Sequence, residues 1–128
     1  YGLGAADAEL EMFASANPVN FGGFSLHPAG SDASRRVRIR IRHAAAAMAE
    51  LGITQVDLIK IDTEGAEYDI LTALPEGIVA GAKYVVGELH GNRDFALLDY
   101  LSRWFDVGLR KRLGNRLFNF QALPKRRR

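Results

Sequence analysis

Short hydrophobic runs separated by polar turns dominate this sequence, and their spacing predicts alternating strands and helices. Residues 56–62 form an apolar run rich in β-branched side chains, and its length favours a buried strand over a helix. Over residues 64–74 apolar side chains recur at helical spacing until Pro75 and Gly77 interrupt the pattern. A second apolar run over 83–89 completes a strand–helix–strand unit. We expect its strands to be parallel neighbours, with residues 56–62 in a central position.

The flanking segments show patterns of both kinds. Residues 94–105 place apolar side chains on one helical face, with Asp94 as the N-cap. Residues 106–112 and 116–122 are predicted as two strands joined through 113–115, a hairpin by its length and turn residues. The remaining predicted elements are a turn at Gly2 and Gly4, a strand over 8–14, a loop over 17–30, a strand over 36–42 and a helix over 44–51 that ends at Gly52. The class that follows is α/β.

Arginines alternate strictly with apolar residues over 36–42. This period predicts a strand with Val37, Ile39 and Ile41 inward and four arginines outward. We interpret the arginine face as protection of an edge strand against pairing with another chain. The alternative is a face that holds an acidic or phosphorylated substrate.

Length and composition limit the classes of protein. The chain has 128 residues and a net charge of +2, which suits one domain or part of one. It has no cysteine, so disulfides, thiolate chemistry and cysteine metal sites are excluded. No apolar run approaches the roughly 20 residues of a membrane span, and no signal-peptide pattern opens the chain. We therefore expect a cytoplasmic protein with no membrane partner, and the start at Tyr1 suggests a fragment or a processed product.

Positive charge concentrates over 35–42, 110–116 and 125–128. Such clusters can attract phosphate groups, but we interpret them as solvated surface. No aromatic residue is interleaved with the basic tail, so it lacks a platform for stacking bases. We expect no nucleic-acid partner.

Carboxylates gather where the predicted central strand meets its helix. Asp62 ends the strand, and Glu64 and Glu67 follow it, at the sheet edge where ligands bind in open parallel α/β folds. The positive end of the helix dipole explains Glu67, whereas Asp62 at the end of a buried strand is less well explained by helix capping. Glu88 and His90 close the next strand and would lie beside Asp62. His90 is a candidate general base, with an ordinary hydrogen-bonding role as the alternative.

Three segments, in order, resemble one enzyme family. DLIKIDTEGAE at 57–67 is similar to the fourth-strand signature "vDllKiDvEGaE" of the FkbM-type S-adenosylmethionine-dependent methyltransferases. GLGAAD at 2–7 resembles the "aLGd" segment after that family's third strand, and GELH at 87–90 resembles the "iEvH" end of its fifth. The family's glycine-rich "D-x-G-A-n-x-G" stretch does not occur in this sequence, and residues 42–44 depart from its "sLDdl" pattern. The resemblance covers most of this chain but only the later part of the family's domain.

The resemblance implies a three-layer Rossmann-like methyltransferase sheet, partial because its first strands are missing, that ends in an antiparallel hairpin. Residues 1–128 would be the C-terminal portion of a single methyltransferase domain: a strand–loop–strand segment over 1–42, the core unit plus hairpin over 56–122, and a basic tail over 123–128. On its own this chain would bind S-adenosylmethionine weakly or not at all. A homo-oligomer is left open.

The chemistry that the resemblance implies is methyl transfer from S-adenosylmethionine to a hydroxyl oxygen of a small molecule or glycan. Candidate catalytic residues are Asp62, Glu64 and His90, and candidate cofactor-binding residues are Gly4, Asp7 and Asp62. No metal ligand is implied for this reaction.

Two alternatives come from other classes. Asp62 and Glu64 also fit the "D-x-E" pair of metal-dependent nucleases, with His90 and Asp94 as the later acid and base of that motif. That motif normally leads into an antiparallel hairpin, whereas here a helix follows. The other alternative is a non-catalytic interaction fragment, which the missing glycine-rich stretch favours.

Overall fold

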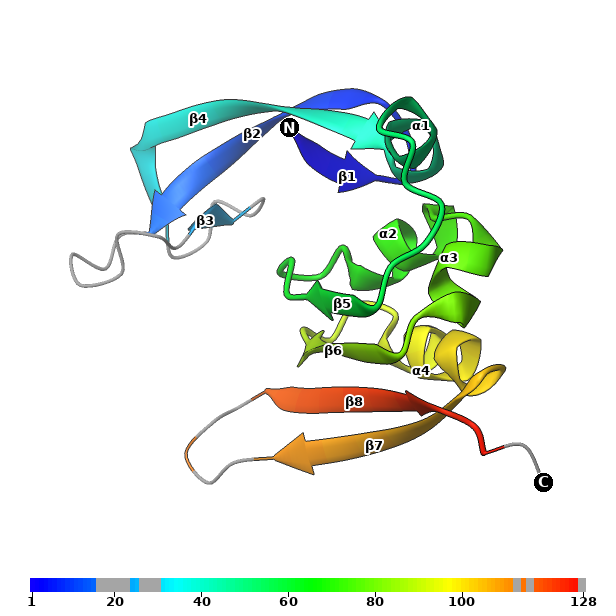
Figure 1. Cartoon of the computed structure of the whole chain (residues 1–128). Coiled ribbons are helices and arrows are strands. Elements are labelled where there is room, and N and C mark those ends of the chain that lie inside the picture. Colours follow the sequence, from blue (N-terminus) through cyan, green and yellow to red (C-terminus); the bar gives the residue numbers. More distant parts are fainter. Residues whose placement is uncertain (16–23, 26–30, 112–113, 115–116, 127–128) are drawn as a thin grey trace.

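A computed structural model describes residues 1–15, 24–25, 31–111, 114 and 117–126 as two four-stranded sheets with four helices (Figure 1). The elements, in chain order, are β1 (Gly2–Gly4), β2 (Ala8–Ser15), β3 (Phe24–Ser25), β4 (Ser31–His43), α1 (Ala44–Glu50), β5 (Leu58–Ile61), α2 (Glu67–Ala73), α3 (Glu76–Gly81), β6 (Tyr84–Leu89), α4 (Asp94–Ser102), β7 (Phe105–Lys111) and β8 (Phe118–Pro124). The first sheet has the order β1-β4-β2-β3 and the second β5-β6-β8-β7. The α/β class is confirmed.

The second sheet confirms the predicted strand–helix–strand unit and the hairpin. β5 and β6 pair in parallel, from Leu58 opposite Tyr84 to Ile61 opposite Gly87. β8 then pairs antiparallel with both β6 and β7. The turn predicted over 113–115 lies largely outside the described residues.

One face of this sheet is packed and the other is open. Along β6, Val85, Gly87 and Leu89 are buried, while the residues between them are half-buried. The buried face shares a core with α2, α3 and α4, to which Leu71 and Val79 contribute fully buried side chains. The described residues therefore form two layers here, and the third layer of the predicted architecture is not confirmed.

The central position predicted for residues 56–62 is wrong for the described chain. β5 lies at the edge of its sheet and pairs only with β6. The segments that precede it, β1 and β4, pair with each other instead. With one side uncovered, Leu58 keeps 58% of its surface exposed and Ile61 is the only buried residue of the strand.

The first sheet corrects three further expectations. Gly2 and Gly4 form a strand rather than a turn, and a Cβ on Gly4 would lie 2.6 Å from Ile41 Cγ2. Glycine therefore permits the close parallel pairing with β4. β4 is an internal strand of the sheet, because it pairs with β2 up to Ile41 and with β1 over 41–43, although over 36–40 it pairs with β2 alone. Val37, expected inward, is 46% exposed.

The helices follow the predicted positions with shifted ends. α1 confirms the helix over 44–51, and Gly52 follows it with φ 66°. α2 starts at Glu67 instead of residue 64, because Glu64 and Gly65 have φ of 55° and 106° and cannot belong to a right-handed helix.

Two other helix predictions need correction. Pro75 ends the predicted helix but also begins α3, which was not predicted. The N-cap of α4 is Arg93, and Asp94 is its first residue.

No helix among the described residues has the length and apolar character to cross a membrane. Most of the predicted loop over 17–30 lies outside the described residues, and Phe24–Ser25 within it form β3.

Candidate active site

Two loops meet at the carboxyl ends of β5 and β6 and bring the predicted catalytic residues together. Because the two strands are parallel neighbours, the turn after Ile61 and the loop after Leu89 lie at the same sheet edge. The Nε2 atom of His90 lies 3.6 Å from Asp62 Oδ1 and 3.8 Å from Glu64 Oε2. The structure therefore brings Asp62, Glu64 and His90 together, as the sequence predicts.

The turn after β5 depends on backbone conformations that few residues adopt. Glu64 and Gly65 both have positive φ, of 55° and 106°, where glycine is free of the Cβ penalty. Asn92 Nδ2 donates a hydrogen bond of 2.7 Å to the Gly65 carbonyl oxygen. The loop after β6 therefore fixes the turn after β5.

The buried side chain of Glu67 contacts both loops. It is 1% exposed, and it is the buried charged residue of the described chain. Its Oε1 accepts hydrogen bonds from Thr63 N at 2.8 Å and Gly65 N at 3.3 Å, and lies 2.9 Å from His90 Nδ1. The helix-dipole role predicted for Glu67 does not account for this position, so the interpretation of Glu67 as a dipole residue is insufficient.

The environment of Glu67 decides its charge. Burial raises the pKa of the Glu67 carboxyl, but donation from the backbone N–H groups of Thr63, Glu67 and Gly65 and the proximity of His90 outweigh burial and hold the pKa below its usual range. Glu67 is therefore a carboxylate, which can only accept hydrogen bonds.

This carboxylate also orients the imidazole of His90. Because Glu67 Oε1 accepts, we assign the shared proton to His90 Nδ1. In the neutral ring Nε2 then carries the lone pair, and it points toward Asp62 and Glu64. The His90 side chain is 7% exposed, and Nε2 has no hydrogen-bond partner among the described residues.

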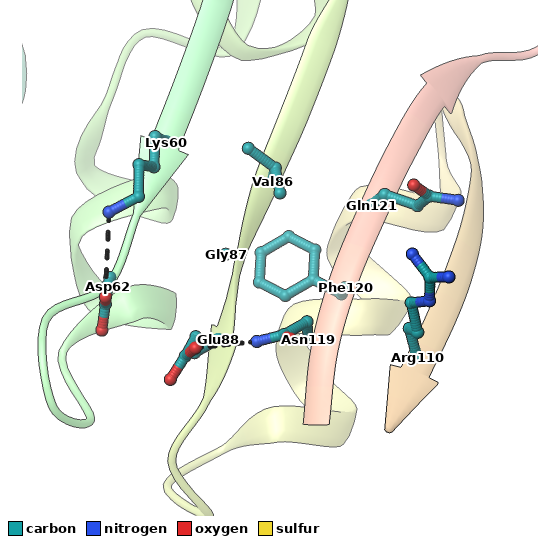
Figure 2. A pocket seen from close by; sticks show the side chains of 9 residues that line it. All are labelled: Lys60, Asp62, Val86, Gly87, Glu88, Arg110, Asn119, Phe120 and Gln121. Carbon is teal, nitrogen blue, oxygen red and sulfur yellow. Dashed lines mark hydrogen bonds and ion pairs between the residues drawn. The ribbon is translucent and has the colours of Figure 1, made fainter. Parts of the chain in front are cut away.

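The open face of the sheet forms a cavity of about 230 Å³ beside these loops. Figure 2 shows Asp62 and Glu88 at one end of it and Arg110 across the sheet. Lys60 Nζ lies 3.8 Å from Asp62 Oδ2, and Asn119 Nδ2 donates to Glu88 Oε1 at 2.9 Å. Glu88 thus has a hydrogen bond that orients it, and Asp62 has an exposed ion-pair partner.

Gly4 and Asp7, the other predicted cofactor-binding residues, lie elsewhere. Gly4 lines a second cavity, of about 380 Å³, together with Thr63 and Ala66 of the turn after β5. Asp7 Oδ1 accepts a hydrogen bond of 2.7 Å from the backbone N–H of His43. Among the described residues no contact joins Asp7 to Asp62, Glu64 or His90, and a cofactor role for Asp7 stays a prediction.

Comparison with known proteins decides the family. Residues 3–117 match the Methyltransferase FkbM domain family. This chain belongs to that family. The FkbM domain is also similar to the AMB antimetabolite synthetase AmbE of Pseudomonas aeruginosa, with 37% identity over 82 residues, which is 58% of this chain and 4% of that protein. No solved structure matches this chain.

Three residues of this site are not fully predictable from sequence patterns. The pattern attributes Glu67 to the helix dipole, places Glu88 near Asp62 without a role, and gives no signal for Asn92. The signal for Glu88 is its period: in β6 it alternates with the buried Gly87 and Leu89 and so faces the open side. No local pattern indicates that Glu67 is buried.

Proposed function

We propose that this FkbM domain is part of an S-adenosylmethionine-dependent O-methyltransferase whose acceptor is a hydroxyl-bearing small molecule or glycan. Family membership supports methyltransferase activity. The observation that carries the proposal is the convergence of Asp62, Glu64 and His90 at one sheet edge, with His90 Nε2 3.6 Å from Asp62 Oδ1.

The described residues fit one wall of a cofactor site. The cavity between Gly4 and the turn at Thr63 and Ala66 has a mainly apolar lining, which suits a flat ring or an alkyl chain. It adjoins Asp62, the neighbour of Thr63 in the chain. Gly4 and Asp62 are the residues we assign to holding S-adenosylmethionine, which when bound supplies a methyl group activated by its positive sulfur.

The acceptor belongs in the cavity on the open face. Its volume of about 230 Å³ is below the roughly 300–1,000 Å³ typical of complete small-molecule sites. It therefore suits one sugar unit or the hydroxylated end of a larger acceptor. Asp62 stands between this cavity and the cofactor wall, where an acceptor hydroxyl must lie.

The chain's own residues position the acceptor and remove its proton. Transfer of the methyl group to the acceptor oxygen would break the carbon–sulfur bond and release a neutral thioether, so the hydroxyl proton would have to pass to a group of this chain. Asp62, Glu64 and His90 Nε2 are the acceptors within reach of that proton. The same groups also orient the acceptor hydroxyl, and this orientation lowers the activation barrier further.

The test is a methyl-transfer assay on the full-length protein that contains this domain. Asp62→Asn keeps the shape of the side chain and removes its charge. We expect it to lower turnover by about 100- to 10,000-fold, a larger effect than the loss of affinity for S-adenosylmethionine that its place on the cofactor wall would cause. The matched control is Asp57→Asn, which removes a carboxylate at the other end of β5, where it pairs with Lys83 at 2.9 Å. Full activity in Asp62→Asn, or equal losses in both variants, would remove the assignment.

The nuclease alternative also invokes Asp94, which accepts a hydrogen bond of 3.0 Å from Gly91 N and is not in the group of carboxylates around His90 Nε2. We therefore add a nucleic-acid cleavage arm to the assay, and cleavage without methyl transfer would reverse this choice.

A further inference from the structure

The wall shared by β5 and β6 has the composition of a cation site. One imidazole nitrogen and two carboxylates, from His90, Asp62 and Glu88, place ligand atoms within 4.8 Å of one another. His90 Nε2 lies 3.6 Å from Asp62 Oδ1 and 4.0 Å from Glu88 Oε2. Two ligands of one ion with bonds of about 2.0–2.2 Å can lie at most about 4.4 Å apart. A small side-chain rotation is enough to close the set around one ion.

A second observation points to a ligand at the same place. The His90 side chain is 7% exposed, and its Nε2 has no hydrogen-bond partner among the described residues. Carboxylate oxygens of Asp62, Glu64 and Glu88 lie 3.6, 3.8 and 4.0 Å from this nitrogen, so the buried ring atom is aimed into a cluster of negative charge that a cation would neutralise. Lys60 does not supply it, because its side chain is 72% exposed and reaches only the outer oxygen of Asp62 at 3.8 Å.

Hydrogen bonds to neighbouring side chains orient two of the three groups, His90 and Glu88. Glu67 accepts from His90 Nδ1, which is the carboxylate–histidine arrangement that fixes the tautomer of metal ligands. Asn119 holds Oε1 of Glu88, so that the other oxygen, Oε2, faces the imidazole. Fixed orientation before binding is what distinguishes a metal site from a chance group of acids.

We propose that Asp62, Glu88 and His90 bind one divalent metal ion that accepts both nitrogen and carboxylate ligands, with Mn²⁺ as the representative ion. The role of this ion rests on the proposed methyl transfer: it would bind the acceptor oxygen at the mouth of the open-face cavity and ease loss of its proton. Glu64, 63% exposed and 3.8 Å from His90 Nε2, is then the carboxylate that remains to take the proton.

The experiment titrates the full-length protein with Mn²⁺ in the absence of S-adenosylmethionine and follows the signal of free Mn²⁺ by electron paramagnetic resonance. We expect saturable binding with nitrogen hyperfine coupling from one imidazole. Glu88→Gln should weaken binding by at least about tenfold, and Asp57→Asn should leave it unchanged. Circular dichroism reports whether each variant folds. If Glu88→Gln does not fold, Asp62→Asn takes its place in the titration.

Each outcome decides the proposal. Absence of saturable Mn²⁺ binding by the wild type overturns it. Equal affinity in Glu88→Gln and Asp57→Asn overturns it too, because the ion then binds elsewhere. Binding at Glu88 without methyl transfer leaves the metal site standing and removes the proposed function. Methyl transfer that persists in chelator, without Mn²⁺ binding, removes the metal site and leaves the proposed function standing.

Discussion

Charged side chains lie close together in two regions of this FkbM domain, and the two regions differ in how far water reaches those side chains. Between β2 and β4, Glu11 and Arg36 form an ion pair of 3.5 Å whose side chains are 47% and 55% exposed. At the ends of β5 and β6, Glu67 is 1% exposed and accepts from four groups. Water screens the first pair, whereas the second depends on fixed partners. The number of charged residues in a stretch of sequence therefore does not indicate how much they contribute to stability until their burial is known.

The largest expected effect tests the buried member of this comparison. Glu67→Ala leaves the Thr63 and Gly65 N–H groups and His90 Nδ1 without their acceptor, so we expect a loss of about 3–5 kcal/mol in the free energy of unfolding. Asp69→Ala is the matched control. It removes another acid from the first turn of α2, one that pairs with Arg93 at the surface, and should cost less than about 1 kcal/mol.

Chemical denaturation of both variants measures the difference. Equal losses would mean that the helix dipole, which the two acids share, explains Glu67 after all. The comparison between buried and exposed charge would then fail.

A smaller effect tests how tightly the floor of the site is packed. A Cβ on Gly87 would meet the backbone oxygen of Ile61 and lie 2.8 Å from Phe120 Cε1, so Gly87→Ala should lower the free energy of unfolding by about 1–3 kcal/mol. Gly108→Ala, in β7 of the same sheet, meets nothing closer than Gln121 at 3.6 Å and should change it by less than about 0.5 kcal/mol. Thermal unfolding of the two variants is the measurement, and a Gly108 loss as large as that at Gly87 contradicts the packing argument.

The smallest effect tests the exposed member. Glu11→Gln removes one charge of the pair with Arg36, and the change in the free energy of unfolding should stay below about 1 kcal/mol at low salt and vanish at high salt. Denaturation at two salt concentrations measures this. A loss as large as that of Glu67→Ala, or one that salt leaves untouched, would show that the two regions are not different in kind.

Local pattern was sufficient for elements whose sequence and surroundings agree. The parallel pairing of β5 with β6, the β7–β8 hairpin and helix α1 follow from period, length and turn residues. It failed where distant contacts decide. Gly2 and Gly4 look like a turn because their pairing partners, Ile41 and His43, lie far along the chain. The run over 56–62 looks buried because its hydrophobicity does not reveal that, among the described residues, only β6 pairs with β5.

The site divides in the same way. Asp62, Glu64 and His90 were predictable as a group, because ends of parallel neighbour strands share one sheet edge. The role of Glu67 was not, since a glutamate in a helix's first turn has the same local sequence whether it faces water or a buried histidine. Gly4 and Asp7 depend on how the first sheet sits against α2, which no local pattern specifies.

One oxygen atom contacts both loops of the site, in addition to the bond from Asn92 to Gly65. Glu67 Oε1 accepts from Thr63 and Gly65 on one side and from His90 on the other. Any motion that withdraws this oxygen frees donors in both loops at once, so the loops open as a single cooperative unit. For protein engineering, this means that neither loop can be grafted onto another scaffold alone. The transplantable piece is the turn after β5, the first residue of α2 and the loop after β6, moved together.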